Sequence, residues 1–256
     1  MAQPENLLKI LRQDRVLHWQ VADPARLGEG SARLALELVD NCRQVRESGA
    51  RFTAIVIESG VGAFCVSPPG NAADCDAAGG GWAAATEAVA RLAPPTVAIM
   101  RGDAIGPAWE LALACDLRIA VSGTGVGSPE IRWGRIPTAG GTQRLTRLAG
   151  MGAALRLLLL GDRIPVAEAR DMGLIHEVAA EIDVDARVEE ILATLRRAAP
   201  VSLGYAKEAA HRSLDLNLEE GLRMEADLAA LLQTTDDRAE GIDAFLHRRE
   251  PRFEGQ

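Results

Sequence analysis

Two glutamates, Glu110 and Glu130, are the residues of this sequence best placed to do chemistry. Glu110 lies about one turn into a predicted helix, and Glu130 follows Pro129 in a predicted loop. Two carboxylates in different surroundings can divide the general acid and general base roles, because each environment sets its own pKa. Each glutamate alone also fits a structural role, since an acid in a first helical turn stabilises the helix dipole. The catalytic interpretation therefore depends on the segments around the pair.

The segments around the two glutamates alternate between strands and helices. Apolar or alternating runs predict strands at 7–11, 16–21, 52–58, 96–101 and 117–121. Helical spacing predicts helices at 31–47, 82–92 and 107–114. The segment 67–81 lacks periodicity and is predicted as a loop, and Gly123, Gly125 and Gly127 predict a turn. This order predicts an α/β fold with right-handed crossovers.

The sequence after Gly141 is predicted to be mostly helical. The expected helices cover 141–149, 151–160, 165–172, 184–198, 202–214, 217–232 and 236–249. Because no stretch resembles a linker, these helices are expected to pack on the α/β core or on a neighbouring subunit. We divide the chain into a core over 1–195 and a helical region over 196–256 that mediates oligomerisation.

Three motifs place the two glutamates in a family context. Glu110 belongs to Gly106-Pro107-Ala108-Trp109-Glu110, Glu130 belongs to Ser128-Pro129-Glu130, and Gly140-Gly141-Thr142-Gln143 follows. These segments and the ending Phe245–Phe253 resemble the enoyl-CoA hydratase/isomerase (crotonase) superfamily from about Phe52 to the C-terminus. The resemblance implies a crotonase-like spiral of ββα repeats with a C-terminal helical region, assembled as a homotrimer or hexamer. It also implies that Glu110 and Glu130 flank the double bond of an acyl thioester as general acid and base.

Two prolines depart from the family pattern. In the family, two backbone N–H groups bind the thioester oxygen, and the positions that match them here are Pro68 and Pro107. Proline has no backbone N–H, so both donors of this oxyanion hole are absent by this alignment. Loss of one such donor typically costs a factor of about 10² to 10³ in rate. The hydroxyl of Ser67 and the N–H of Ala108 are possible replacement donors.

The resemblance implies further substrate contacts and no cofactor. It places Val66, Gly106, Trp133 and Gly134 beside the substrate, and the coenzyme A thioester is itself the substrate. The lysine that usually follows the first donor segment is absent, since Gly70-Asn71 stand there. The carrier therefore stays open between CoA, an acyl-carrier protein and neither.

Composition excludes several other classes of protein. A net charge of −8 argues against nucleic acid as a partner, because phosphate binding needs a basic surface. No apolar run approaches the roughly 20 residues of a membrane span. The N-terminus lacks the basic start of a signal peptide, so we expect a cytoplasmic protein. The four cysteines and four histidines show no metal-ligand spacing, and the cysteines are expected to be reduced.

Two functions from different classes remain in competition. The favoured hypothesis is an enzyme, a hydratase, dehydratase or isomerase of acyl thioesters with an altered oxyanion hole. The alternative is a catalytically weak or inert homologue that serves as a partner or scaffold subunit. Retention of Glu110 and Glu130 favours the enzyme, whereas loss of both donors favours the scaffold. The sequence does not identify the acyl chain or the direction of the reaction.

Overall fold

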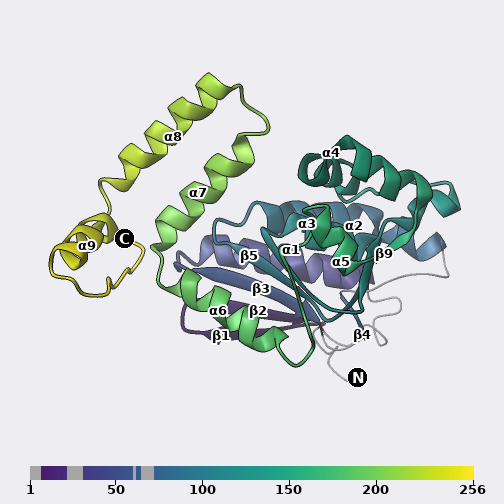
Figure 1. Cartoon of the computed structure of the whole chain (residues 1–256), viewed down its shortest axis with the longest axis horizontal. Coiled ribbons are helices and arrows are strands. Elements are labelled where there is room, and N and C mark those ends of the chain that lie inside the picture. The colour runs from purple at the N-terminus through teal and green to yellow at the C-terminus, as the bar shows by residue number, and fades with distance from the viewer. Residues whose placement is uncertain (1–6, 22–30, 60–61, 65–71) are drawn as a thin grey trace.

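The computed structural model describes residues 7–21, 31–59, 62–64 and 72–256, whose strands form two sheets (Figure 1). A six-stranded sheet has the order β1 (Leu8–Gln13), β2 (Val16–Val21), β3 (Ala54–Ser59), β5 (Thr96–Met100), β7 (Leu117–Val121) and β10 (Glu177–Ala179). A four-stranded sheet has the order β4 (Gly62–Ala63), β6 (Gly102–Ile105), β8 (Gly125–Gly127) and β9 (Arg163–Pro165). The pairs β1–β2 and β8–β9 are antiparallel, and the other pairs are parallel.

Repeats of two strands and a helix build the centre of the molecule. They are β3–β4–α2, β5–β6–α3 and β7–β8–α4, where α2 spans Ala72–Ala90, α3 spans Pro107–Ala114 and α4 spans Gly141–Leu160. In each repeat the first strand joins the six-stranded sheet and the second joins the four-stranded sheet. A short 3-10 helix, η3 (Pro129–Trp133), precedes α4. This arrangement confirms the predicted α/β fold of ββα repeats.

Both faces of the six-stranded sheet are covered by helices. Ile55 and Ile57 of β3 pack in a core cluster with Leu38 of α1 (Ser31–Glu47). Val56 faces the other side and packs in a second cluster with Val188 of α6 (Val184–Arg196). Alternate residues of a strand point to opposite faces, so a strand between two helical layers needs apolar residues throughout. This accounts for the nearly continuous apolar run that predicted β3.

Three local predictions were wrong. Residues 72–81 are helical and belong to α2, although they were predicted as loop. At the end of this stretch α2 packs closely on α1, since a Cβ at Gly81 would contact the Cβ of Ala35 at 3.5 Å. Gly125 and Gly127 lie in strand β8, not in a turn, because a side chain at Gly127 would collide with the backbone of Asp162. Arg163 lies in β9, although no strand was predicted between the expected helices 151–160 and 165–172.

The C-terminal helices stand away from the sheets (Figure 1). After α5 (Val166–Asp171) and α6 come α7 (Pro200–Arg212), α8 (Leu218–Leu232) and α9 (Asp236–Leu246). The end of the chain returns to the core, where Arg15 donates to Phe253 O at 2.6 Å and Arg51 donates to Gly255 O at 3.1 Å. Within the described ranges no helix is long and apolar enough to cross a membrane. The boundary between residues 195 and 196 stays a prediction.

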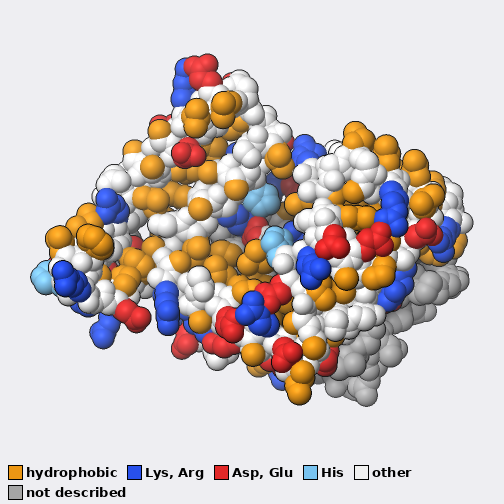
Figure 2. Space-filling model, viewed as in Figure 1, with side chains coloured by type: hydrophobic (Ala, Val, Ile, Leu, Met, Phe, Trp, Pro, Cys, Tyr) orange, Lys and Arg blue, Asp and Glu red, His pale blue; other side chains and the backbone are white. Residues whose placement is uncertain are grey.

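Apolar side chains lie exposed on the C-terminal helices and on α4 (Figure 2). The more exposed of them include Met151, Leu159, Leu160, Leu218, Phe245 and Leu246. A helix normally buries its apolar face against another element, so this surface fits the predicted trimer or hexamer. Oligomeric state nevertheless stays a prediction.

Candidate functional site

The glutamate site is built around Gly106, where strand β6 turns into helix α3. Gly106 has φ 60° and ψ −128°, and its N–H donates to Gly127 O of β8 at 2.9 Å. The positive φ favours glycine. A Cβ at this position would also lie 3.1 Å from Oε1 of Glu130. The neighbouring strands β6 and β8 thus bring the segments that carry Glu110 and Glu130 to one place.

Glu110 is buried at the first turn of α3, with 2% of its surface exposed. Its Oε1 accepts the backbone N–H of Ala139 at 2.7 Å and that of Gly141 at 2.8 Å. Burial raises the pKa of Glu110 to about 7, opposed by these two hydrogen bonds and assisted by the charge of Glu130. A carboxyl group with this pKa exchanges a proton readily near neutral pH.

The two donors to Glu110 come from the turn 139–141, at the start of α4. Gly140 has φ 98°, in the left-handed region, and precedes the first residue of the helix. A Cβ at Gly141 would lie 3.0 Å from Oε1 of Glu110 and 2.9 Å from Cβ of Pro137. Glycine at position 141 therefore lets the backbone reach the carboxylate.

Glu130 lies in the first turn of η3, after strand β8. Its Oε2 is buried and has no hydrogen-bond partner within the described part of the chain. Burial raises the pKa of Glu130, whereas its own backbone N–H and the nearby Arg135 act in the opposite direction. Both glutamates consequently favour the protonated form more than an exposed carboxyl group does.

Pro107 is the first residue of α3 and so occupies the helix start that the sequence suggested. The N–H groups of a first helical turn have no carbonyl partner inside the helix, and proline supplies none at this point. Ala108 follows within the same turn and is buried. Pro68, Ser67 and Val66 lie outside the described residues, as does the loop that would carry the other donor.

Trp133 and Gly134, predicted to contact substrate, lie at the end of η3. Trp133 is 47% exposed, and Gly134 ends the 3-10 helix in the left-handed conformation with φ 68°. Both residues are four positions or fewer from Glu130 in the chain. Their contact with substrate stays a prediction.

Sequence reasoning missed the groups that hold Glu110. Ala139 was not singled out, and Gly141 was interpreted only as the start of a helix. Two further side chains act on the same turn, since Thr86 and Arg144 each donate to Ala139 O at 2.8 Å. The glycine pair 140–141 was the available signal, because a backbone that approaches a carboxylate closely needs glycine.

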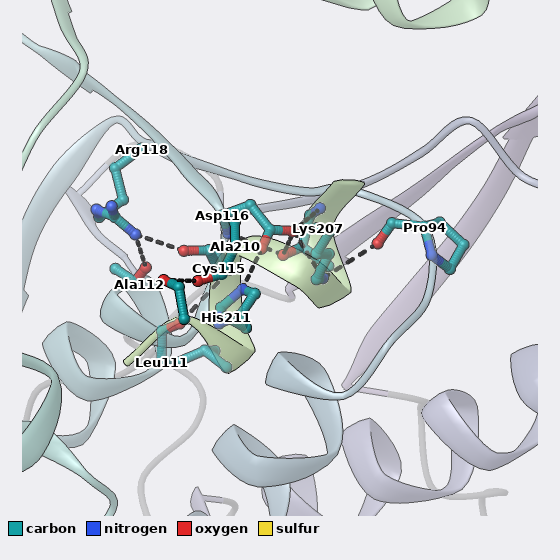
Figure 3. A network of polar contacts seen from close by, with 11 residues as sticks. Pro94, Leu111, Ala112, Cys115, Asp116, Arg118, Lys207, Ala210 and His211 are labelled. Carbon is teal, nitrogen blue, oxygen red and sulfur yellow. Dashed lines mark hydrogen bonds and ion pairs between the residues drawn. The ribbon is translucent and has the colours of Figure 1, made fainter. Parts of the chain in front are cut away.

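Another carboxylate, the half-buried Asp116, lies just beyond the end of α3 (Figure 3). Its Oδ2 accepts the Thr96 N–H at 2.7 Å and pairs with Lys207 Nζ at 2.7 Å, and its Oδ1 lies 3.0 Å from His211 Nε2. Burial alone would raise the pKa of Asp116, but His211 and Lys207 hold it below the usual value. Asp116 thus binds the first residue of β5 and also ties α7 to the core.

Within the described residues no group of histidine, cysteine and acidic side chains could hold a metal ion. Cys42 and Cys115 are free and buried, and burial raises the pKa of each thiol to about 12. The glutamate site itself brings together two carboxyl groups with raised pKa values.

Comparison with known proteins identifies related chains. A family model for enoyl-CoA hydratase/isomerase matches residues 12–256. The 2,3-dehydroadipyl-CoA hydratase of Escherichia coli is 38% identical over 163 residues, which cover 63% of this chain and 64% of the relative. An enoyl-CoA isomerase/hydratase of Mycosarcoma maydis is 39% identical over 171 residues, 66% of this chain and 62% of the relative. The matches thus span just under two thirds of the length of these curated relatives.

Solved structures extend the likeness over nearly the whole chain. The enoyl-CoA hydratase of Bacillus anthracis superposes with a TM-score of 0.91 at 30% identity, covering 98% of this chain and 100% of that one. An enoyl-CoA hydratase subunit of Geobacillus kaustophilus gives 0.86 at 29% identity, covering 98% and 99%. These superpositions confirm the predicted crotonase-like spiral with its C-terminal helices.

Proposed function

The chain belongs to the enoyl-CoA hydratase/isomerase family, and from this membership we propose that it is a hydratase, dehydratase or isomerase of acyl thioesters that uses Glu110 and Glu130 as its acid/base pair. The observation that carries the proposal is the local setting of the pair. Glu130 lies beside Gly106, and Glu110 lies in the helix that begins after Gly106. Both carboxyl groups have raised pKa values, and two backbone N–H groups orient Glu110. Buried acids with separately tuned environments are typical of general acid/base sites.

The surroundings divide the two roles. The N–H groups of Ala139 and Gly141 favour the carboxylate form of Glu110, which suits a general base. Glu130 has a buried Oε2 without a donor in the described residues, which suits a protonated general acid. In hydration, Glu110 removes a proton from water while the water oxygen bonds to Cβ of the substrate. Glu130 gives a proton to Cα of the substrate. Exchange with solvent then returns Glu110 to the carboxylate and Glu130 to the acid, and dehydration runs the same steps in reverse.

The substrate class proposed is an acyl thioester, with coenzyme A as the favoured carrier. Support comes from the family and from related proteins whose names specify CoA substrates. Homotrimeric or hexameric assembly and a cytoplasmic location are also proposed. The exposed apolar surface of α4 and the C-terminal helices supports the assembly.

The acid/base assignment is tested with crotonyl-CoA as the probe. Purified protein is assayed for hydration beside Glu110→Gln and Glu130→Gln, which keep the shape of each side chain and remove its ionisation. We expect each variant to lose a factor of about 10² to 10⁴ in kcat. Glu219→Gln is the matched control, since this exposed glutamate pairs only along its own helix with Arg223. Activity that survives both changes would remove the assignment.

We include an altered oxyanion hole in the proposal because α3 begins at Pro107. Pro107→Gly returns an N–H to a position that makes no bond inside the helix. We expect kcat to rise by up to about 10²-fold with little change in KM, because the donor acts on charge that develops only in the enolate. Ala108→Gly is the control, since it adds glycine to the same turn without adding a donor. Pro68→Ala supplies the corresponding test on the other loop.

The missing N–H at Pro107 is also the reason to test the alternative function, an inert partner or scaffold subunit. If neither the parent protein nor Pro107→Gly hydrates crotonyl-CoA, although the folded protein binds the thioester in calorimetry, the enzyme proposal with this substrate fails. A folded protein that neither binds nor turns over acyl thioesters would favour an inert partner subunit.

A further inference from the structure

The turn that binds Glu110 is itself held by a hydroxyl from another helix. We propose that Thr86 of α2 is a positioning residue for Glu110, acting through the backbone of Ala139. The inference rests on the proposed function for its effect on catalysis, whereas its structural part concerns only the carboxyl group of Glu110. Thr86 touches neither glutamate in the hydrogen bonds of the described residues.

The geometry links three elements in one short relay. Thr86 is 1% exposed, and its Oγ1 donates to Ala139 O at 2.8 Å. The N–H of the same residue, Ala139, donates to Glu110 Oε1 at 2.7 Å. A hydroxyl has one hydrogen, and the alternative acceptor, Ala83 O in the same helix, lies farther away at 3.2 Å. The shorter contact therefore ties α2 to the turn 139–141 and so to α3.

Arg144 of α4 donates to the same carbonyl oxygen. Its Nη1 donates to Ala139 O at 2.8 Å, and its guanidinium lies 3.6 Å from Glu87, the residue after Thr86. Helix α2 thus acts on Ala139 directly through Thr86 and indirectly through Glu87 and Arg144. Without the Thr86 hydroxyl, Ala139 O keeps one charged donor, so the turn can remain folded while its orientation is less restrained.

Loss of that restraint should reach Glu110 through its N–H donors. The donors from Ala139 and Gly141 favour the charged form, so weaker bonds raise the pKa of Glu110 further. The charged groups that act on Glu110 are Glu130 from η3 and Arg144 from α4, with Glu87 of α2 paired to Arg144. Thr86 is neutral, so replacing it changes none of these charges. A shift in the titration of Glu110 would therefore report its hydrogen bonds.

The test compares Thr86→Val, which removes the hydroxyl, with Thr86→Ser, which retains it. Thr146→Val is the matched control, because among the described residues the Thr146 hydroxyl bonds only within its helix, to Thr142 O at 2.8 Å. With crotonyl-CoA we expect Thr86→Val to lower kcat by roughly 10-fold to 10²-fold and to leave KM unchanged, because small misplacements of a catalytic group are costly. The acid limb of the pH–rate profile should move to higher pH. Thr86→Ser and Thr146→Val should resemble the parent protein.

A second readout needs no activity. In protein labelled with ¹³C at the glutamate carboxyl carbon, the Glu110 resonance is assigned by its absence from Glu110→Gln. We expect it to titrate at higher pH in Thr86→Val than in the parent protein, Thr86→Ser or Thr146→Val. If the parent hydrates no thioester, the proposed function fails while this titration still decides the positioning role. Should valine prevent folding, Thr86→Ala removes the hydroxyl without a methyl group beside Ala139 O. An unchanged Glu110 titration in a folded variant that lacks the hydroxyl would overturn the inference.

Discussion

Glu110 and Asp116 lie on the same short stretch of chain, one inside α3 and one just beyond it, yet their environments differ in kind. Glu110 receives only backbone N–H donors and lies near a second carboxyl group, Glu130. Asp116 receives backbone and hydroxyl donors from Thr96 and contacts Lys207 and His211. Burial acts to raise both pKa values, but only Asp116 has cationic partners that reverse the effect.

The contrast separates a carboxylate suited to proton transfer from one suited to docking. A pKa near neutrality lets Glu110 gain and lose a proton at working pH. The lowered pKa of Asp116 keeps it ionised, so it holds Lys207 of α7 against the core over a wide pH range. In this protein the acid without a directly bonded cation is the catalytic candidate, and the acid bonded to Lys207 and His211 is the structural one.

The largest expected effect comes from neutralising each acid in turn. Glu110→Gln should lower kcat by a factor of about 10² to 10⁴, and it should not lower the free energy of unfolding at pH 7, because it removes a buried carboxyl group whose ionisation is unfavourable in the folded protein. Asp116→Asn should leave kcat of the folded protein unchanged and lower the free energy of unfolding by about 3 kcal/mol. The cause of that loss is the Lys207 side chain, which is 9% exposed and would remain without its anion.

Urea unfolding and steady-state kinetics on the same preparations measure both effects. Because asparagine has the size of aspartate, a loss of stability in Asp116→Asn reports the lost charge and not a change in packing. A fall in kcat for Asp116→Asn as large as that for Glu110→Gln would break the comparison, because both acids would then serve catalysis.

The pH dependence of stability should differ in sign between the two acids. The pKa of Glu110 is raised from 4.5 to about 7 in the folded protein, so the folded state binds more protons than the unfolded state between these values. Stability should therefore fall as pH rises from 4.5 to 7, by up to about 3 kcal/mol. Asp116 has a lowered pKa, so its contribution is present above its ordinary pKa and is lost as pH falls through the folded value.

Chemical unfolding of the parent protein, Glu110→Gln and Asp116→Asn across this pH range tests the two signs. The difference between the parent and Glu110→Gln should change between pH 4.5 and 7. The difference for Asp116→Asn should change only at more acidic pH. A parent curve that parallels the Glu110→Gln curve over the whole range would show that Glu110 titrates normally.

The smallest effects concern the two partners of Asp116. Lys207→Met should destabilise the protein by about 1 to 3 kcal/mol, because it removes the cation that pairs with Asp116. The Asp116 carboxylate then keeps only its contacts with His211 and Thr96 among the described residues. His211→Ala should cost at most about 1 kcal/mol, since its side chain is 55% exposed and the ion pair is screened by water. Thermal unfolding of the two variants shows which substitution lowers stability more. Equal losses would mean that exposure does not distinguish the partners.

Local pattern was sufficient for much of the fold and for the identity of the two glutamates. Helix α3 was predicted over residues 107–114 with its observed bounds, because an apolar strand, a glycine and a proline mark its start. Helix α2 was predicted to begin ten residues too late, because residues 72–81 show no helical period in the sequence, and the contact of Gly81 with Ala35 of α1 exists only in the folded chain. Strand β8 was predicted as a turn because the sequence alone does not show why Gly125 and Gly127 are required. A side chain at either glycine would collide with Arg163 or Asp162, which are distant in sequence.

The sequence by itself determined the bounds of helix α3, and it determined that position 107 has no backbone N–H to donate. These properties are covalent or depend on residues a few positions apart. Only the tertiary structure decided that Glu110 accepts N–H groups from Ala139 and Gly141, and that Asp116 pairs with Lys207 and His211. The physical reason is that a pKa depends on burial and on the donors and charges within a few ångströms, and the fold brings those groups from distant parts of the chain.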